Sequence, residues 1–167
     1  IVKGICSFHG TNFDSLPPGF SFSGAVSLAV YNNELYAGGS QRLGPWPYIP
    51  CSANIDKWNG TSWSCVGAGG PGGTNVINAM AVYNGELYVG GNFTSMGGLP
   101  VNRIARWDGT QWKDVGGGVT GSIPQITEMT VYNGRLYVGG TFGNAGGIPA
   151  YNIARWNGTQ WDSVGWG

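Results

Sequence analysis

Charge is scarce in this sequence of 167 residues, since eight Lys and Arg balance eight Asp and Glu and charged residues make up only 10% of the chain. An average soluble domain has about 25%. Binding to nucleic acids rests on the neutralisation of phosphates, and no cluster of basic residues is present to supply it. No apolar run approaches the roughly 20 residues that span a bilayer. We therefore expect neither a nucleic-acid partner nor insertion into a membrane.

Titratable side chains of the kinds that usually perform catalysis are also few. The chain has a single histidine, His9, whereas a nucleophile triad or a metal site generally requires several suitably placed His, Cys or acidic residues. The acids fall largely at hairpin turns or near strand ends, where carboxylates usually cap the backbone or face solvent. We therefore predict no catalytic residue, no metal site and no cofactor, and we predict that the protein is not an enzyme.

Glycine and aromatic residues are abundant instead, with 32 Gly, eight Trp and eight Tyr. The glycines show no three-residue period, which excludes collagen, and the aromatic content is too high for a disordered chain. The chain begins at Ile1, which favours a mature or excised piece. Low charge, frequent Trp and Asn-Gly-Thr sequences favour an oxidising setting, so we expect an extracellular or cell-surface protein.

An internal repeat organises most of the chain. The segment MAVYNGELYVGG, which begins at Met80, returns as MTVYNGRLYVGG at Met129, and residues 80–118 align with residues 129–167 without a gap at a spacing of 49. A third copy begins at Leu28 with LAVYNNELYAGG and carries three extra residues before its Trp58. Self-similarity at such a period is typical of repeat architectures.

Each repeat predicts two β-hairpins. In the first, two short runs rich in β-forming residues flank Asn84-Gly85, the strongest short signal for a hairpin turn. In the second, RIARW and TQWKDV flank Asp108-Gly109. A Gly-rich loop, NFTSMGGLPVN, is expected to join the two hairpins. No convincing helix is found, because Gly and Pro recur too often. Four short antiparallel strands in about 49 residues form the blade of a β-propeller.

The order of a strand ending in Gly-Gly, a loop, an aromatic residue, a short turn and a Trp resembles kelch-type repeats. Here it reads LYVGG at residues 87–91, then Trp107, Asp108-Gly109 and Trp112. Together with the repeats, the resemblance implies an all-β protein of three four-stranded propeller-type blades, and the first 21 residues, which do not match the repeat, form an N-terminal arm. The first aromatic is Trp where kelch repeats usually have Tyr, and the turn is shorter. We place the arm at residues 1–21 and the blades at 22–74, 75–123 and 124–167.

Three blades are too few to close a ring, because propellers typically have four to eight. Two aromatic blade faces would remain open and would need a cover. Further repeats or other copies of the chain could supply it, for example as a six-bladed ring of two chains or as a filament. We expect the arm to pair with an outer strand edge, either of its own last blade or of a neighbouring chain.

Three Asn-x-Thr sequences, at Asn59, Asn92 and Asn157, are candidate glycosylation sites. In two of them the turn also explains the Asn-Gly pair. Three cysteines are an odd number; we expect a disulfide between Cys51 and Cys65, with Cys6 free or bonded to another chain, although Cys6 could pair with either.

The tryptophans that recur in each repeat fit either a core between blades or a surface that stacks on sugars, and we favour the core. Candidates for contacts with a ligand or partner lie mostly outside the repeat pattern: Trp46, Tyr48, Tyr151 and Trp166. We expect a protein that associates with copies of itself as a structural or adhesive surface or filament subunit. The alternatives are a lectin of propeller type that binds glycans, and a fragment of a longer kelch-like propeller.

Overall fold

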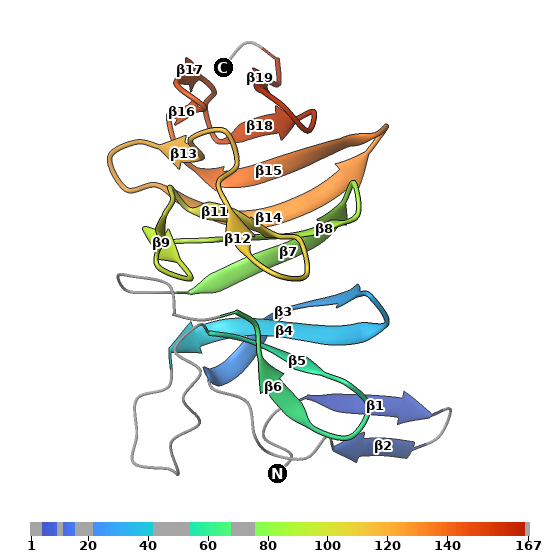
Figure 1. Ribbon diagram of the computed structural model, residues 1–167. Coiled ribbons are helices and arrows are strands. Elements are labelled where there is room, and N and C mark those ends of the chain that lie inside the picture. The colour runs from blue at the N-terminus through green and yellow to red at the C-terminus, as the bar shows by residue number, and fades with distance from the viewer. Residues whose placement is uncertain (1–4, 10–11, 16–21, 42–53, 68–75, 166–167) are drawn as a thin grey trace.

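In the computed structural model, which describes residues 5–9, 12–15, 22–41, 54–67 and 76–165, the protein consists of strands and turns. No helix occurs in these ranges, and hence none that is long and apolar enough to cross a membrane. Three four-stranded antiparallel sheets dominate the structure and lie one above another in Figure 1. The predicted all-β fold with propeller-type blades is confirmed.

Each blade is a simple meander, because every strand is hydrogen-bonded to the strand that follows it within the same blade. Blade 1 contains β3 (Phe22–Tyr31), β4 (Glu34–Gln41), β5 (Ile55–Trp58) and β6 (Trp63–Cys65). Blade 2 contains β7 (Ile77–Tyr83), β8 (Glu86–Gly91), β11 (Ile104–Trp107) and β12 (Trp112–Lys113). Blade 3 contains β14 (Gln125–Tyr132), β15 (Arg135–Thr141), β18 (Ile153–Trp156) and β19 (Trp161–Ser163).

The first hairpin of each blade closes as the sequence predicts. Asn84 and Gly85 have φ angles of 49° and 74°, so both central residues of the turn are left-handed. A two-residue turn of this kind matches the right-handed twist of its strands, and Asn and Gly tolerate the positive φ. The corresponding turns of blades 1 and 3 are built in the same way. The turn pairs thus set the strand register, for example Tyr83 opposite Glu86.

The loop between the two hairpins is more ordered than the sequence analysis expects. In blade 2 it contains a small hairpin of β9 (Ser95–Met96) and β10 (Leu99–Pro100). In blade 3, β16 (Asn144–Ala145) and β17 (Ile148–Pro149) pair in the same way, and β13 (Val119–Thr120) joins them as a third strand. The prediction of a plain loop is therefore wrong. A Gly-Gly pair with positive φ closes each small hairpin, and Gly-Gly is itself a hairpin signal.

The described part of the N-terminal arm folds on itself. β1 (Cys6–His9) pairs with β2 (Asn12–Ser15), with Cys6 opposite Ser15. This hairpin lies beyond blade 1, at the opposite end of the molecule from blade 3 (Figure 1). Within the described residues, β1 and β2 pair only with each other and neither pairs with a strand of blade 3. The part of the arm that the structure describes therefore does not add to the last blade of its own chain. Pairing with a neighbouring chain stays a prediction.

Candidate interaction surface

The two faces of each blade have different neighbours, because side chains alternate along a strand. In β8, Leu87 and Val89 share a core cluster with residues of blade 1, whereas Tyr88 belongs to the cluster shared with blade 3. In β4, Tyr36 likewise faces blade 2. Each blade therefore turns one face toward the preceding blade and a Tyr-bearing face toward the next.

Contacts that cross from blade 2 to blade 3 hold the stack in register. The hydroxyl of buried Tyr83 donates to the carbonyl oxygen of Gly134 at 2.9 Å, and Nε1 of Trp161 donates to that of Val115 at 2.8 Å. The side chain of Asn78 donates to the carbonyl of Ile126 at 2.8 Å. These bonds add directional specificity to an interface that is otherwise apolar.

Glycines allow neighbouring blades to approach closely. A Cβ added to Gly38 would lie 2.6 Å from the Cγ2 of Ile77, and one added to Gly90 would lie 2.7 Å from the Cγ2 of Ile126. After the fourth strand of blade 2, Gly116 likewise lies against the rings of the tryptophan pair of blade 3. A Cβ added to Gly116 would lie 2.5 Å from Trp156. Such distances leave no room for a side chain.

Among the described residues, no blade packs on the Tyr-bearing face of blade 3. We call this surface, which carries Tyr132, Tyr137, Gly139 and Ile153, the C face. Tyr132 is 62% exposed, whereas the equivalent Tyr31 and Tyr83 are each 4% exposed. Ile153 is 41% exposed, whereas its equivalents in blades 1 and 2 are fully buried. The residues of the internal interfaces are thus repeated here without the cover that they have elsewhere.

The glycines of the C face also lack the neighbours that their equivalents have. Gly139 corresponds to Gly38 and Gly90, yet within the described residues a Cβ added there would meet only atoms 4.0 Å away. Gly165 corresponds to Gly116, and no described atom lies within 4 Å of its added Cβ. The C face therefore has the shape of one half of a blade–blade interface.

At the other end of the stack, blade 1 turns its first face away from blade 2. We call this surface the N face; it carries Leu28, Val30, Leu35, Ala37, Trp58 and Trp63, which strand pairing places on one side of the sheet. Leu28 is 51% exposed and Val30 is 68% exposed. The arm covers another part of the N face, because Ile5 is buried in a cluster with Ala37, Leu35 and Trp63.

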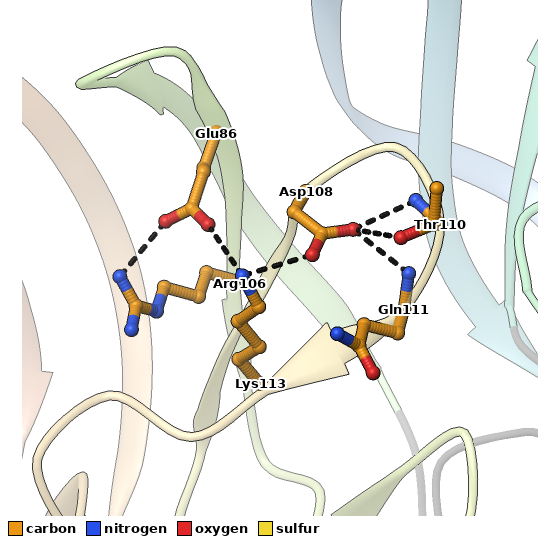
Figure 2. Close-up of polar contacts among 6 residues, drawn as sticks. All are labelled: Glu86, Arg106, Asp108, Thr110, Gln111 and Lys113. Atoms are coloured by element: carbon orange, nitrogen blue, oxygen red, sulfur yellow. Dashed lines mark hydrogen bonds and ion pairs between the residues drawn. The ribbon is translucent and has the colours of Figure 1, made fainter.

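Strand pairing places a charged cluster on the Tyr-bearing side of blade 2, and Figure 2 shows its polar contacts. Glu86 accepts from Arg106 at 2.8 Å and from Lys113 at 3.3 Å, and Lys113 also lies 2.8 Å from Asp108. Hydrogen bonds from Lys113 and Thr110 hold the pKa of Asp108 well below its usual range. Burial works against the charged form of Arg106, but Glu86 and the hydroxyl of Tyr88 together outweigh this effect and raise the pKa of the guanidinium.

Blade 3 carries a related cluster in which two positions exchange their charges, while Arg155 matches Arg106 and Asn157 replaces Asp108. Arg135 occupies the position of Glu86, and Asp162 occupies that of Lys113. Asp162 accepts from Arg135 at 2.9 Å and lies 3.5 Å from the Nε of Arg155. The pairing is thus kept while the acid moves from one strand to another, and on the C face these side chains are between a third and two fifths exposed.

This exchange predicts a compensating set of substitutions. Glu86→Arg alone is expected to lower the free energy of unfolding by about 1 kcal/mol, because it places three cations together. Adding Lys113→Asp and Asp108→Asn reproduces the arrangement of blade 3 and should restore most of that loss. Urea unfolding of both variants measures the effect; a triple variant no more stable than the single one would contradict the exchange.

Burial at the blade interfaces also raises the pKa values of two tyrosines, Tyr36 and Tyr88. Desolvation, together with nearby Glu34, raises the pKa of Tyr36 to about 12. Desolvation likewise raises the pKa of Tyr88, although Trp156 and Arg106 act in the opposite direction. The phenol of Tyr36 therefore stays neutral well above pH 10, and burial favours the neutral form of Tyr88 as well.

The predicted glycosylation sites differ in their surroundings. Asn59 and Asn157 lie in the four-residue turns of the second hairpins, where each side-chain oxygen accepts from the backbone two and three residues on at 2.9 Å. Asp108 makes the equivalent bonds in blade 2. Asn92 is half-buried, and its Oδ1 accepts from the backbone of Val76 at 2.9 Å. Turn and loop geometry thus explains these asparagines, and their glycosylation stays a prediction.

The remaining predicted site residues are brought together only in part. Cys65, at the end of β6, is disulfide-bonded, but its partner side chain lies outside the described residues, so the pairing with Cys51 stays a prediction. Trp46, Tyr48, Cys51 and Trp166 also lie outside them. Tyr151 is 57% exposed in the loop that leads to β18. In the described ranges no three His, Cys, Asp or Glu residues gather as a metal site would need.

Sequence reasoning missed the residues that define the open faces. The recurrent Trp107, Trp112, Trp156 and Trp161 are buried, as expected for a core, whereas Trp58 and Trp63 are half-buried on the N face. Tyr132 and Ile153 escaped notice because they match buried residues of the other repeats. The available signal was that both residues lie in the third repeat, which no further repeat follows in this sequence of 167 residues.

Comparison with known proteins agrees with this architecture. A family model described as a domain of unknown function (DUF5122) beta-propeller matches residues 84–107 and 133–158. These two segments are equivalent parts of blades 2 and 3, from the first hairpin turn to the third strand. A search of the curated proteins finds no match. Fold and family model together define the chain as a protein built from β-propeller blades.

Proposed function

We propose that the chain is a non-catalytic, extracellular β-propeller protein that associates with copies of itself as a structural or adhesive subunit. The observation that carries this proposal is the C face, where Tyr132 is 62% exposed although its two counterparts inside the stack are 4% exposed. An apolar surface of this kind, shaped for another blade, marks an association site. The disulfide at Cys65 and the low charge support an oxidising compartment.

Association through the C face predicts a specific loss on substitution. Ile153→Glu places a charge where an apolar contact forms and should raise the concentration needed for association at least about tenfold, since burying an isoleucine contributes on the order of 1.5–3 kcal/mol. Sedimentation velocity with electron microscopy of the same sample measures the assembled mass and shape. Ile123→Glu is the matched control, because Ile123 is 79% exposed in a loop outside the blade.

The outcomes separate the possible functions. Rings or filaments that dissociate with Ile153→Glu but persist with Ile123→Glu support a structural subunit. Self-association is overturned if the chain stays monomeric at every concentration, both as the wild type and with the arm displaced from the N face. In that case the glycan-binding alternative gains weight, because exposed Tyr151 and Tyr132 present rings that can stack on sugars. Binding to a glycan array, lost in Tyr151→Ser, would identify a lectin.

A further inference from the structure

In blades 1 and 2, the isoleucine of the third strand shares a buried cluster with the same two positions of the next blade. Ile55 shares a buried cluster with Leu87 and Val89 of blade 2, and Ile104 shares one with Leu136 and Val138 of blade 3. The partners occupy equivalent positions in β8 and β15. The same two positions in blade 1 are Leu35 and Ala37, which lie on the N face.

In blade 1, the arm supplies this isoleucine. Ile5 is 7% exposed and shares a cluster with Ala37, against which Leu35 and Trp63 also pack. It thus takes, at the N face, the place that Ile55 and Ile104 take within the stack. Ile153, the corresponding residue of blade 3, is 41% exposed on the C face. Among the described residues, Ile153 therefore lacks a packed surface at the C face, whereas the arm covers part of the N face at the opposite end of the stack.

The two end faces are complementary in shape as well. Inside the stack, Gly116 of one blade receives the tryptophan pair of the next, and Gly165 is the same glycine on the C face with no described atom near it. The tryptophan pair of blade 1, Trp58 and Trp63, packs ring against ring with centroids 5.5 Å apart but is only half-buried on the N face. Stacking a second copy would continue the internal interface in register.

We propose that Ile5 of the N-terminal arm acts as a cap which competes with the C face of a second copy for the N face, so that displacing Ile5 switches the chain to head-to-tail association. This inference rests on the proposed self-association and names its partner surface and its control. Because the cap must first be displaced, only uncapped chains can bind a second copy, and the apparent affinity between copies falls in proportion to the uncapped fraction. Leu28 and Val30, exposed beside the covered part, offer the first contact.

The test uses the full chain with Ile5→Glu, which forces the arm from its apolar site. Sedimentation velocity should show that this variant associates at a concentration about tenfold or more below that of the wild type. Adding Leu28→Glu on the N face, or Ile153→Glu on the C face, should return it to a monomer. Adding Ile123→Glu, outside both faces, should leave the association unchanged.

Mixing the two monomeric double variants identifies the orientation, because each keeps one good face. Head-to-tail docking predicts a one-to-one dimer that does not grow further. A Leu28→Glu double variant that still dimerises alone would show that C faces meet each other, and would overturn the head-to-tail arrangement. If wild type and Ile5→Glu associate equally, the cap is wrong while the proposed function stands. If neither associates, both fail.

Folding is checked separately by near-ultraviolet circular dichroism, which reports the buried tryptophan pairs of blades 2 and 3. Ile5→Ala provides a second variant in case the charged one disturbs blade 1. It leaves no charge in the apolar site, so it should shift the association in the same direction by a smaller factor. An Ile5→Ala chain that folds and associates exactly as weakly as the wild type would count against the cap.

Discussion

Replacing Tyr83 with alanine is expected to lower the free energy of unfolding by about 3–5 kcal/mol. The side chain is 4% exposed between blades 2 and 3, and its ring packs edge-on against Tyr88 with centroids 5.7 Å apart. Its hydroxyl also donates to the carbonyl of Gly134, so truncation leaves both a cavity and an acceptor without its donor. Urea unfolding followed by tryptophan fluorescence measures the loss.

Tyr132→Ala is the matched control, because it removes the same side chain from the equivalent position of blade 3. With 62% of Tyr132 exposed, the change should alter the free energy of unfolding of the dilute chain by less than about 0.5 kcal/mol. At concentrations where copies associate, the same variant should weaken the assembly. Equal losses at both positions in dilute solution would contradict the assignment of an open C face.

Gly90→Ala is expected to cost about 1–3 kcal/mol, although it adds only one methyl group. The new Cβ would lie 2.7 Å from the Cγ2 of Ile126, which is fully buried in blade 3, and 3.3 Å from the Cε of Met129. Relief requires the two blades to move apart or Ile126 to leave its packing site. Thermal and urea unfolding should both show the loss.

Gly139→Ala tests the same position where no blade follows. Its nearest described neighbours would lie 4.0 Å from the new Cβ, so the monomer should be unaffected or gain about 0.4–1 kcal/mol from a less flexible unfolded chain. If a second copy docks on the C face as blade 3 docks on blade 2, this methyl group should weaken association. A stabilised monomer that associates like the wild type would indicate that docking follows another geometry.

The repeat and its turns could be predicted because their causes are local. The Asn-Gly pair at residues 84–85 adopts positive φ in both positions, as a two-residue hairpin turn requires, and Asn and Gly tolerate that conformation best. The alternation of side chains in β8 then follows from strand geometry alone. For the same reason, the four-stranded blade and the burial of the repeated tryptophans in blades 2 and 3 could be inferred from the sequence.

Other features escaped prediction because they depend on neighbours distant in sequence. The hairpin at Ser95–Met96 was expected to be an irregular loop, yet Met96 is completely buried in the cluster between blades 1 and 2. The arm was expected to add to the edge of a blade, yet its strands pair with each other and Ile5 packs on a blade face. The Gly-Gly pair at residues 97–98 signals the turn of the small hairpin, but nothing within either segment indicates which distant residues it packs against.

By itself, the sequence determined the main strands of the blades, their hairpin turns and the number of repeats, because each depends on residue type and spacing. The tertiary structure decided which of the equivalent residues are covered. Tyr83 and Tyr132 lie in matching repeats with the same turn beside them, and only the position of their blades in the stack makes one buried and the other exposed. Burial depends on what packs against a side chain, and the residues of a repeat do not state whether another blade packs on them.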